Sequence, residues 1–332
     1  MENNNEIIND FFYDYLLNAI HRLGSTNKIA GGEGIAYFLD DDFVVKEYKE
    51  SSDWGRFDAV FETYCKEMQN FAMQGYNVPK IYAWLKIPNF DYYTKGAKNF
   101  YKYYILEERV KGRNLYYGFL EDFYPACKDM FSHEEFKYIT SYPEENVSAY
   151  QEIVKKYLKD YIMMNERLES MPEDVLAKFL TDLYSMNLNA KQSTPDIFPS
   201  NMLVSDDKIS IIDSRIWFEE NGKHFSRKNL DNTFLYDMTN LFFYNEEVKN
   251  IQKEVKFKLK DLSSCNYAYY QRKNKKVSSA AIERVFKLMN KYCDGFVCTD
   301  PKTYMLTIGA LNSIVGKDSA EKIIANVPTA FE

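Results

Sequence analysis

The chain of 332 residues has few of the residues from which metal centres and disulfide frameworks are built. It contains three histidines, and its five cysteines are scattered, odd in number and without a Cys-x-x-Cys pair: Cys65, Cys127, Cys265, Cys293 and Cys298. Such spacing argues against a structural zinc site and against a disulfide framework. We therefore expect the thiols to be small buried apolar groups in a reducing compartment.

A basic excess and long apolar runs are also lacking. The formal net charge of -7 argues against a dedicated nucleic-acid binder, which needs a basic face. No run approaches the roughly 20 apolar residues that a membrane-spanning helix needs, and the N-terminus MENNNEIIND is polar and acidic. We expect a soluble cytoplasmic protein without a transmembrane segment. A protein delivered into the cytosol of a host cell by a specialised apparatus would show the same features.

Apolar residues make up 45% of the chain, which is enough to fill a large core. Short apolar runs and one helical pattern fill the first third, and long helical patterns follow Gly112. This order predicts an α+β fold with a small β-rich N-lobe that contains one helix and a larger, mostly helical C-lobe. The expected divisions are an N-terminal helical extension over 1–24, an N-lobe over 25–107, and a C-lobe with extra C-terminal helices over 108–332.

Individual elements follow from the same patterns. Helical spacing is found in 6–23, 56–74, 148–168, 172–188 and from about 231 onward, with Ser278 or Ser279 as a cap for a helix that runs to Cys293. Strands are expected at 35–39 and 43–48, joined by a turn of three aspartates, and at VPKIYAWL, YKYYILEE, NMLV and KISIID.

The polar residues around the last two strands suggest chemistry. Asp196 and Asn201 have the D-x-x-x-x-N spacing of a catalytic loop, and Asp213 ends the apolar strand that follows. Phosphoryl transfer needs magnesium ligands, a group that orients the acceptor hydroxyl, and a cation on the nucleotide phosphates. Asp196 would orient the hydroxyl and accept its proton, while Asn201 and Asp213 would hold Mg²⁺. An ordinary hairpin with polar ends is the alternative for either motif taken alone.

With these motifs the chain resembles the protein kinase-like superfamily, which includes eukaryotic-type kinases, aminoglycoside and choline phosphotransferases, and compact kinases that bacteria deliver into host cells. AGGEGIAYF looks like a shortened glycine-rich loop, in which Gly31, Gly32 and Gly34 would let backbone N–H groups approach phosphates. Lys46 in FVVKEY matches the lysine that the family places on the α- and β-phosphates. The resemblance implies a two-lobed fold, ATP as substrate and Mg²⁺ as cofactor.

Further roles are implied by the same resemblance. The family pairs its lysine with a glutamate on the next helix; we prefer Glu67 for this role, and Glu62 is the rival. ILEERVKGRNL is similar to the hinge between the lobes, so backbone groups of Glu108 and Val110 would bind the adenine edge. Asp237 in LYDMTNLFF would tie down the catalytic-loop backbone; its alternative role is a surface charge on a helix.

Several positions depart from the family pattern. Thr194 and Pro195 stand where a histidine is usual, and Phe198 occupies the position that would indicate the type of acceptor. The short stretch between Asp213 and Asp237 leaves no room for a long activation loop, so control would come from another ligand or partner.

Two basic clusters could bind such a regulator, for example a phosphorylated partner, an inositol polyphosphate or an anionic lipid headgroup. The alternative for both clusters is a solvated polar loop or helix face. The clusters are Arg272, Lys273, Lys275 and Lys276, and Lys223, His224, Arg227 and Lys228.

Three functions fit these residues. We favour an atypical Ser/Thr protein kinase, for which a secreted bacterial effector is one identity, because the helical lobe shows no obvious acidic pocket for an acceptor. A small-molecule phosphotransferase of the aminoglycoside or choline type is the alternative, and the net acidity would suit its cationic substrates. A nucleotide-binding pseudokinase scaffold is the third.

Overall fold

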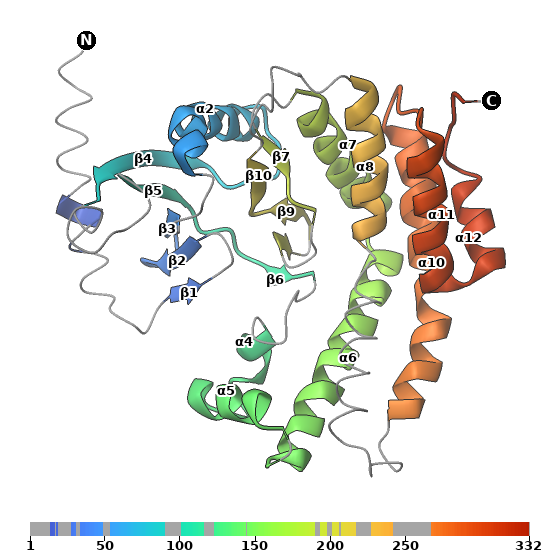
Figure 1. Ribbon diagram of the computed structural model, residues 1–332, viewed down its shortest axis with the longest axis horizontal. Coiled ribbons are helices and arrows are strands. Elements are labelled where there is room, and N and C mark those ends of the chain that lie inside the picture. Colours follow the sequence, from blue (N-terminus) through green and yellow to red (C-terminus); the bar gives the residue numbers. More distant parts are fainter. Residues whose placement is uncertain are drawn as a thin grey trace. The chain divides into compact units, whose positions relative to one another are not determined.

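The computed structural model describes most of the chain, and the described residues form two compact units (Figure 1). The first unit draws on residues 1–111, 189–194 and 210–223, and the second on 112–188, 195–209 and 224–332. The described residues 210–216 fall in the sheet-bearing unit. The described residues are 14–16, 18, 28–30, 34–48, 54–89, 101–115, 123–143, 145–189, 193–197, 201–205, 207–216, 227–241 and 267–331.

A five-stranded antiparallel sheet is the centre of the first unit, with the strand order β1-β2-β3-β5-β4. The predicted hairpin is confirmed as β2 and β3, and its turn is held by Asp40, whose carboxylate accepts the N–H groups of Asp42 and Phe43 at 2.8 Å. The strands are β1 (Lys28–Ala30), β2 (Gly34–Phe38), β3 (Phe43–Tyr48), β4 (Ile81–Pro88) and β5 (Tyr101–Glu108).

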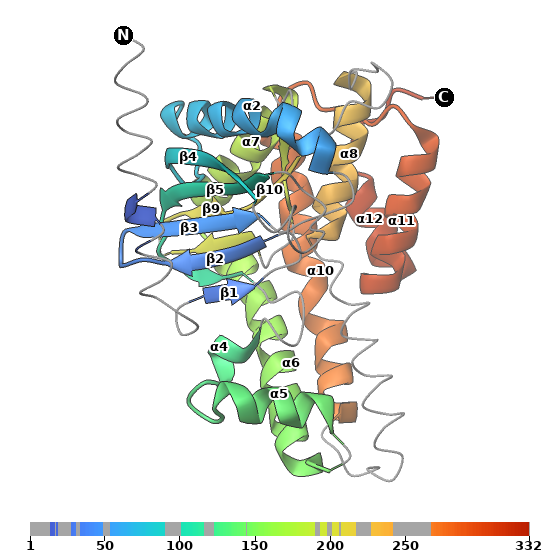
Figure 2. The same cartoon turned by 60° about the vertical axis from the view of Figure 1, so that its left-hand side comes forward.

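The two faces of this sheet bury different side chains. On one face Val45 and Tyr104 pack with Leu16, which is fully buried, so part of the expected N-terminal helix does lie on the body. Tyr15, expected on the same helix side, is 46% exposed. The opposite face meets helix α2 (Trp54–Met73), whose buried residues recur with helical spacing: Phe61, Tyr64, Cys65, Met68 and Phe71. Figure 2 shows α2 lying along this sheet.

Gly34 is required where β2 begins. A Cβ atom at this position would lie 2.5 Å from the carbonyl oxygen of Glu47 on the neighbouring strand, which is far inside van der Waals contact. Gly34 was predicted as part of the glycine-rich loop, and the structure gives it a close backbone approach. Gly31 and Gly32 lie outside the described residues.

The second unit is mostly helical, as the sequence predicted. Helix α10 packs along α6, and Arg284 of α10 donates to the carbonyl oxygens of Leu168 and Glu169 at 2.9 and 2.7 Å, near the C-terminal end of α6 (Figures 1 and 2). The helices are α4 (Tyr124–Cys127), α5 (His133–Ser141), α6 (Val147–Ser170), α7 (Glu173–Asn189), α8 (Arg227–Asn240), α10 (Tyr267–Tyr292), α11 (Pro301–Val315) and α12 (Lys317–Ile324).

The predicted cap at Ser278 or Ser279 is wrong. Helix α10 begins at Tyr267, so both serines lie in its interior. The preceding residues QRKNKK are largely good helix formers, and they continue the helix toward its N-terminus past the serines. A side-chain cap is found instead at α11, where Asp300 accepts the N–H groups of Lys302 and Thr303 before Pro301 opens the first turn.

Short strands border the polar segment that carries Asp196, Asn201 and Asp213. Strands β8 (Met202–Val204) and β9 (Ile209–Ile211) confirm the predicted runs NMLV and KISIID, and β6 (Arg113–Asn114) pairs with β8. Strand β10 (Ser214–Ile216) pairs with β7 (Ser193–Pro195). The polar segment is therefore fixed by backbone pairing on both sides of Asp213.

Four cysteines lie among the described residues, and all four are buried free thiols: Cys65, Cys127, Cys293 and Cys298. Burial raises the pKa of the Cys293 thiol to about 12, so this group is an apolar filler at neutral pH. The helices within the described ranges include none that is both long and apolar enough to cross a membrane.

The close approach at Gly34 predicts that Gly34→Ala lowers the free energy of unfolding by about 1–3 kcal/mol, because a backbone carbonyl must move. Gly309 is the opposite control, since it lies in α11 and an added Cβ would meet nothing within 4 Å. Gly309→Ala should raise stability by about 0.5–1 kcal/mol. Urea unfolding of both variants measures this, and equal effects would contradict the sheet register.

Candidate functional site

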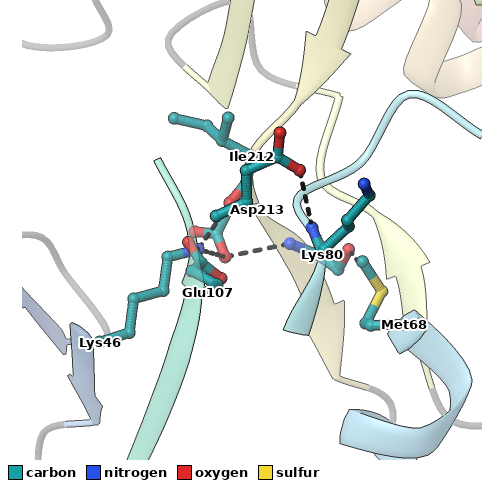
Figure 3. A network of polar contacts seen from close by, with 8 residues as sticks. Lys46, Met68, Lys80, Glu107, Ile212 and Asp213 are labelled. Atoms are coloured by element: carbon teal, nitrogen blue, oxygen red, sulfur yellow. Dashed lines mark hydrogen bonds and ion pairs between the residues drawn. The ribbon is translucent and has the colours of Figure 1, made fainter. Parts of the chain in front are cut away.

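Lys46 lies at the centre of a polar cluster inside the first unit. Its ammonium donates to the carbonyl oxygen of Ile212 at 2.6 Å and lies 3.1 Å from Oε1 of Glu107. Oδ1 of Asp213 is 3.9 Å from the same nitrogen (Figure 3). The lysine side chain is 20% exposed and that of Glu107 is 9% exposed. Two carboxylates and a carbonyl dipole thus surround one largely buried cation.

The sheet register explains how Lys46 and Glu107 meet. Lys46 on β3 lies opposite Ile105 on β5, and Glu107 is two residues further along β5. Residues two apart on a strand project from the same face, and long side chains can span the diagonal distance between paired strands. The face shared by these two residues is the one that meets α2, where Phe61 packs its ring on Tyr103 at 4.9 Å.

Asp213 is placed by anchors on either side of it. The N–H of Ile211 donates to the carbonyl oxygen of Asn77 at 2.9 Å. The hydroxyl of Ser214, which is 4% exposed, donates to Sδ of Met68 on α2 at 3.4 Å. The N–H of Ser214 also donates to Oδ1 of Asp213 at 3.0 Å. The carboxylate is therefore held near Lys46 while its side chain remains 37% exposed.

Burial dominates the electrostatics of this cluster. It raises the pKa of Glu107 above the ordinary value, and the neighbouring Lys46 ammonium opposes part of that rise. Burial also raises the pKa values of Tyr48 and Tyr64, whose hydroxyls hydrogen-bond one another and lie in the field of Asp213 and Glu107. The tyrosines stay neutral at physiological pH, so the charges of the cluster belong to Lys46 and the two acids.

Asp196 and Asn201 are brought together in the second unit. Nδ2 of Asn201 donates to Oδ2 of Asp196 at 2.8 Å, so the two ends of the D-x-x-x-x-N motif are in contact, while their catalytic roles stay predictions. Asp237 of α8 is 2% exposed. Its alternative role as a surface charge is therefore wrong, while its predicted role in tying down the loop backbone stays a prediction.

The predicted hinge contains one group already in use. The N–H of Glu108 donates to the carbonyl oxygen of Lys80 at 2.8 Å, so an adenine contact at Glu108 would use its carbonyl oxygen. The contacts of Glu108 and Val110 with adenine stay predictions. Gly112 has φ +153°, and a Cβ there would lie 3.0 Å from the carbonyl oxygen of Val204, so the turn after the hinge requires glycine.

Other predicted residues lie where the structure does not describe a side chain. Phe198, Lys223 and His224 are outside the described residues. The remaining basic residues lie on helices α8 and α10, and at these positions the structure describes only the backbone. They are Arg227, Lys228, Arg272, Lys273, Lys275 and Lys276. A regulator site at either basic cluster stays a prediction.

The sequence did not single out Glu107. It predicted that Lys46 pairs with Glu67, with Glu62 as the rival. Glu62 forms an ion pair with Lys66 at 2.6 Å and is 66% exposed. Glu67 borders a surface hollow together with Lys66 and Asn70. The pairing of β3 with β5 is the signal for Glu107, and it becomes visible only when the intervening helix and strand have been placed.

Breaking the ion pair should be costly. Lys46→Met leaves a buried carboxylate without its cation and should lower the free energy of unfolding by about 2–3 kcal/mol, less than the roughly 3–5 kcal/mol of a fully buried pair. Lys46→Met/Glu107→Gln should recover part of this loss. Lys66→Met, which breaks an exposed pair, should cost less than about 1 kcal/mol. Denaturant unfolding of wild type, these three variants and the single variant Glu107→Gln tests this, and additive losses from the two cluster substitutions would contradict it.

The direction of the Glu107 pKa also predicts a pH dependence. A carboxyl group whose pKa is raised on folding binds its proton more tightly in the native state, so its stabilising contribution is present at acid pH and is lost as the pH rises through the native pKa. The stability of wild type relative to Glu107→Gln should therefore fall between pH 4.5 and neutrality. Unfolding free energies of both proteins across this range measure it; a rising difference would mean that Lys46 outweighs burial.

Comparisons with known proteins give remote likenesses to solved structures. No protein-family model matches the chain, and no curated protein matches it. Among solved structures, WbdD in complex with a kinase inhibitor has a TM-score of 0.33 and 14% sequence identity to this chain. The match covers 74% of this chain and 44% of the WbdD chain, so this chain matches less than half of the length of WbdD. Aminoglycoside 2'-phosphotransferase-IIIa with GDP has a TM-score of 0.27, 13% identity and coverage of 92% and 93% of the two chains.

An aminoglycoside phosphotransferase in complex with ADP and hygromycin B has a TM-score of 0.25 and 12% identity, over 92% of this chain and 96% of that one. Identities and scores this low do not establish a family. What is established is a mixed α+β protein, with a small antiparallel sheet and one helix in the first unit and mainly helices in the second.

Proposed function

We propose that this chain is an ATP- and Mg²⁺-dependent phosphotransferase that acts on a hydroxyl group, with Ser or Thr of a protein as the favoured acceptor. The observation that carries the proposal is the approach of Lys46 to Asp213. These residues are far apart in the sequence, yet the first unit brings the ammonium within 3.9 Å of the carboxylate. A cation beside an acidic group at the end of a strand is the pairing that nucleotide phosphates and their metal need.

Lys46 supplies the positive charge. Its stem is largely buried and its ammonium is fixed by Glu107 and by the carbonyl oxygen of Ile212, so the charge has a defined place before substrate binds. Phosphate oxygens that bind near this nitrogen would gain more than in bulk water, because the surroundings have a lower effective dielectric constant.

The residues present suit Mg²⁺. Asp213 offers carboxylate oxygens from a partly exposed side chain, and Asn201 uses its amide nitrogen toward Asp196, so its carbonyl oxygen is the atom that can serve as a ligand. Within the described ranges no group of three or more His, Cys, Asp or Glu side chains could hold a metal. Mg²⁺ commonly takes one or two protein oxygens and completes its shell with phosphate oxygens and water. When bound, the ion neutralises charge on the transferred phosphoryl group.

Asp196 is assigned the proton transfer. The acceptor hydroxyl oxygen forms a bond to the γ-phosphorus while the bond from that phosphorus to the bridging oxygen of ADP breaks. The hydroxyl proton passes to the Asp196 carboxylate, and the Asn201 amide bonded to Oδ2 at 2.8 Å limits the rotation of that carboxylate.

The acceptor class rests on sequence features. The short stretch between Asp213 and Asp237 suits both compact protein kinases and small-molecule phosphotransferases. The net charge of -7 supports the second candidate, a phosphotransferase for cationic small molecules such as aminoglycosides or choline. A pseudokinase scaffold would keep nucleotide binding without turnover, so activity separates it from both.

The test uses the full chain with Mg²⁺ and ATP. Wild type should bind Mg²⁺-ATP by calorimetry and should gain the mass of phosphoryl groups, or transfer them to proteins of a cell extract. Asp196→Asn should keep nucleotide binding and lose about 10²–10⁴-fold in turnover, because proton transfer is impaired. Asp213→Asn should lose the Mg²⁺-dependent part of binding.

Asp207→Asn is the matched control, because Asp207 is an exposed acid in the turn between β8 and β9. This substitution should change neither nucleotide binding nor turnover. Turnover only after addition of an aminoglycoside or choline would favour the small-molecule reading. Nucleotide binding without any turnover would favour the scaffold. Absence of nucleotide binding by wild type would overturn the proposal.

A further inference from the structure

We propose that Glu107 is the residue that positions Lys46 for the nucleotide, so that the lysine is fixed within the sheet and its place does not depend on helix α2. This inference rests on the proposed function and assigns the lysine partner to a strand instead of a helix. Glu107 acts through Lys46 and is a positioning residue.

The contacts of Lys46 come first. Glu107 is its nearer carboxylate, at 3.1 Å against 3.9 Å for Asp213, and is the more buried of the two. At equal dielectric constant, the shorter distance makes the attraction of Lys46 to Glu107 stronger than its attraction to Asp213. Solvent and salt also screen the Glu107 pair less, because Glu107 is more deeply buried. Of the two carboxylates, Glu107 therefore orients the ammonium more strongly, and the carbonyl oxygen of Ile212 accepts a hydrogen bond from it at 2.6 Å.

The backbone makes this pair rigid. Strands β3 and β5 are direct neighbours, with Val44 opposite Glu107 and Lys46 opposite Ile105. Ladder hydrogen bonds fix the register, so the two Cα atoms can separate only if the strands do. A lysine held by a carboxylate on a packed helix would instead shift whenever that helix shifts.

The side of α2 that meets the sheet is apolar or uncharged at neutral pH. It buries Tyr64, Cys65 and Met68, whose exposures are 5% or less. Met68 reaches the neighbourhood of Asp213 through a neutral contact with Ser214. Among the acids of α2, Glu62 pairs with Lys66 at 2.6 Å, and Glu67 borders the surface hollow.

A second consequence concerns the metal ligand. Glu107 and Asp213 share one ammonium, so a neutral residue at position 107 would let Lys46 move toward Asp213. Mg²⁺ would then compete with the ammonium for the Asp213 carboxylate. Loss of Glu107 should therefore raise the Mg²⁺ concentration needed for nucleotide binding, which a purely structural role would not do.

The experiment compares wild type with Glu107→Gln and Glu67→Gln in the full chain, by Mg²⁺-ATP calorimetry and by titration of Mg²⁺ at fixed ATP. Glu107→Gln should weaken nucleotide binding about 10–100-fold, the range typical when a residue that orients a ligand group is lost, and should raise the Mg²⁺ midpoint. Its effect should exceed that of Glu67→Gln at least about tenfold. Glu321→Gln, on exposed α12, is the matched surface control.

The outcomes are distinct. A larger loss from Glu67→Gln, or unchanged binding and Mg²⁺ midpoint in Glu107→Gln, would overturn this inference while wild-type binding upholds the proposed function. No binding of Mg²⁺-ATP by wild type would overturn both. If circular dichroism shows that Glu107→Gln does not fold, Glu107→Asp takes its place. Glu107→Asp should raise the dissociation constant for Mg²⁺-ATP and the Mg²⁺ midpoint, each by less than Glu107→Gln would. If neither value rises, the inference is overturned.

Discussion

The antiparallel pairing of β3 with β5 is the constraint on which the cluster depends. It places Lys46 and Glu107 on one face of the sheet, and that face is covered by α2, so both charges leave bulk water. Desolvating two ions is expensive, and their mutual attraction, the carbonyl oxygen of Ile212 and the Asp213 carboxylate offset part of the cost. Such an arrangement contributes little to net stability, which is why a functional reason for keeping it is needed.

Neutral groups of the helix and of the polar segment complete this environment. Met68 and Ser214 form a neutral contact beside Asp213, and Tyr48 and Tyr64 satisfy one another at the edge of the cluster. These groups exclude water and keep the dielectric constant low near Lys46. Asp213 is the exception, since its carboxylate remains partly open to solvent. The cluster thus has one buried acid and one accessible acid, and they suit different tasks.

The sequence predicted the features that depend on local pattern and missed those that depend on pairing. Hydrophobic alternation located β2, β3, β5, β8 and β9, and helical spacing located α2, α6 and α7. Strands β1, β7 and β10, with the sequences KIA, STP and SRI, lack apolar runs such as NMLV and KISIID, which contain β8 and β9. Lys46 and Asp213 followed from their motifs, but Glu107 required knowledge that β5 lies next to β3. The error at Ser278 and Ser279 arose because a serine can also lie inside a helix whose neighbours are good helix formers.

If the lysine is fixed within the sheet, control of the proposed activity must act elsewhere. The stretch between Asp213 and Asp237 is too short for a long activation loop, and Lys46 and Glu107 lie on neighbouring strands, so their pairing needs no charged group from α2. The group left to respond is Asp213, which touches Lys46 only at 3.9 Å and is anchored through its neighbours Ile211 and Ser214. A ligand or partner that altered those anchors would shift the Asp213 carboxylate while the Lys46 ammonium stayed in position. Regulation would then act on metal binding by Asp213, and the contact of Lys46 with the nucleotide phosphates would be unchanged.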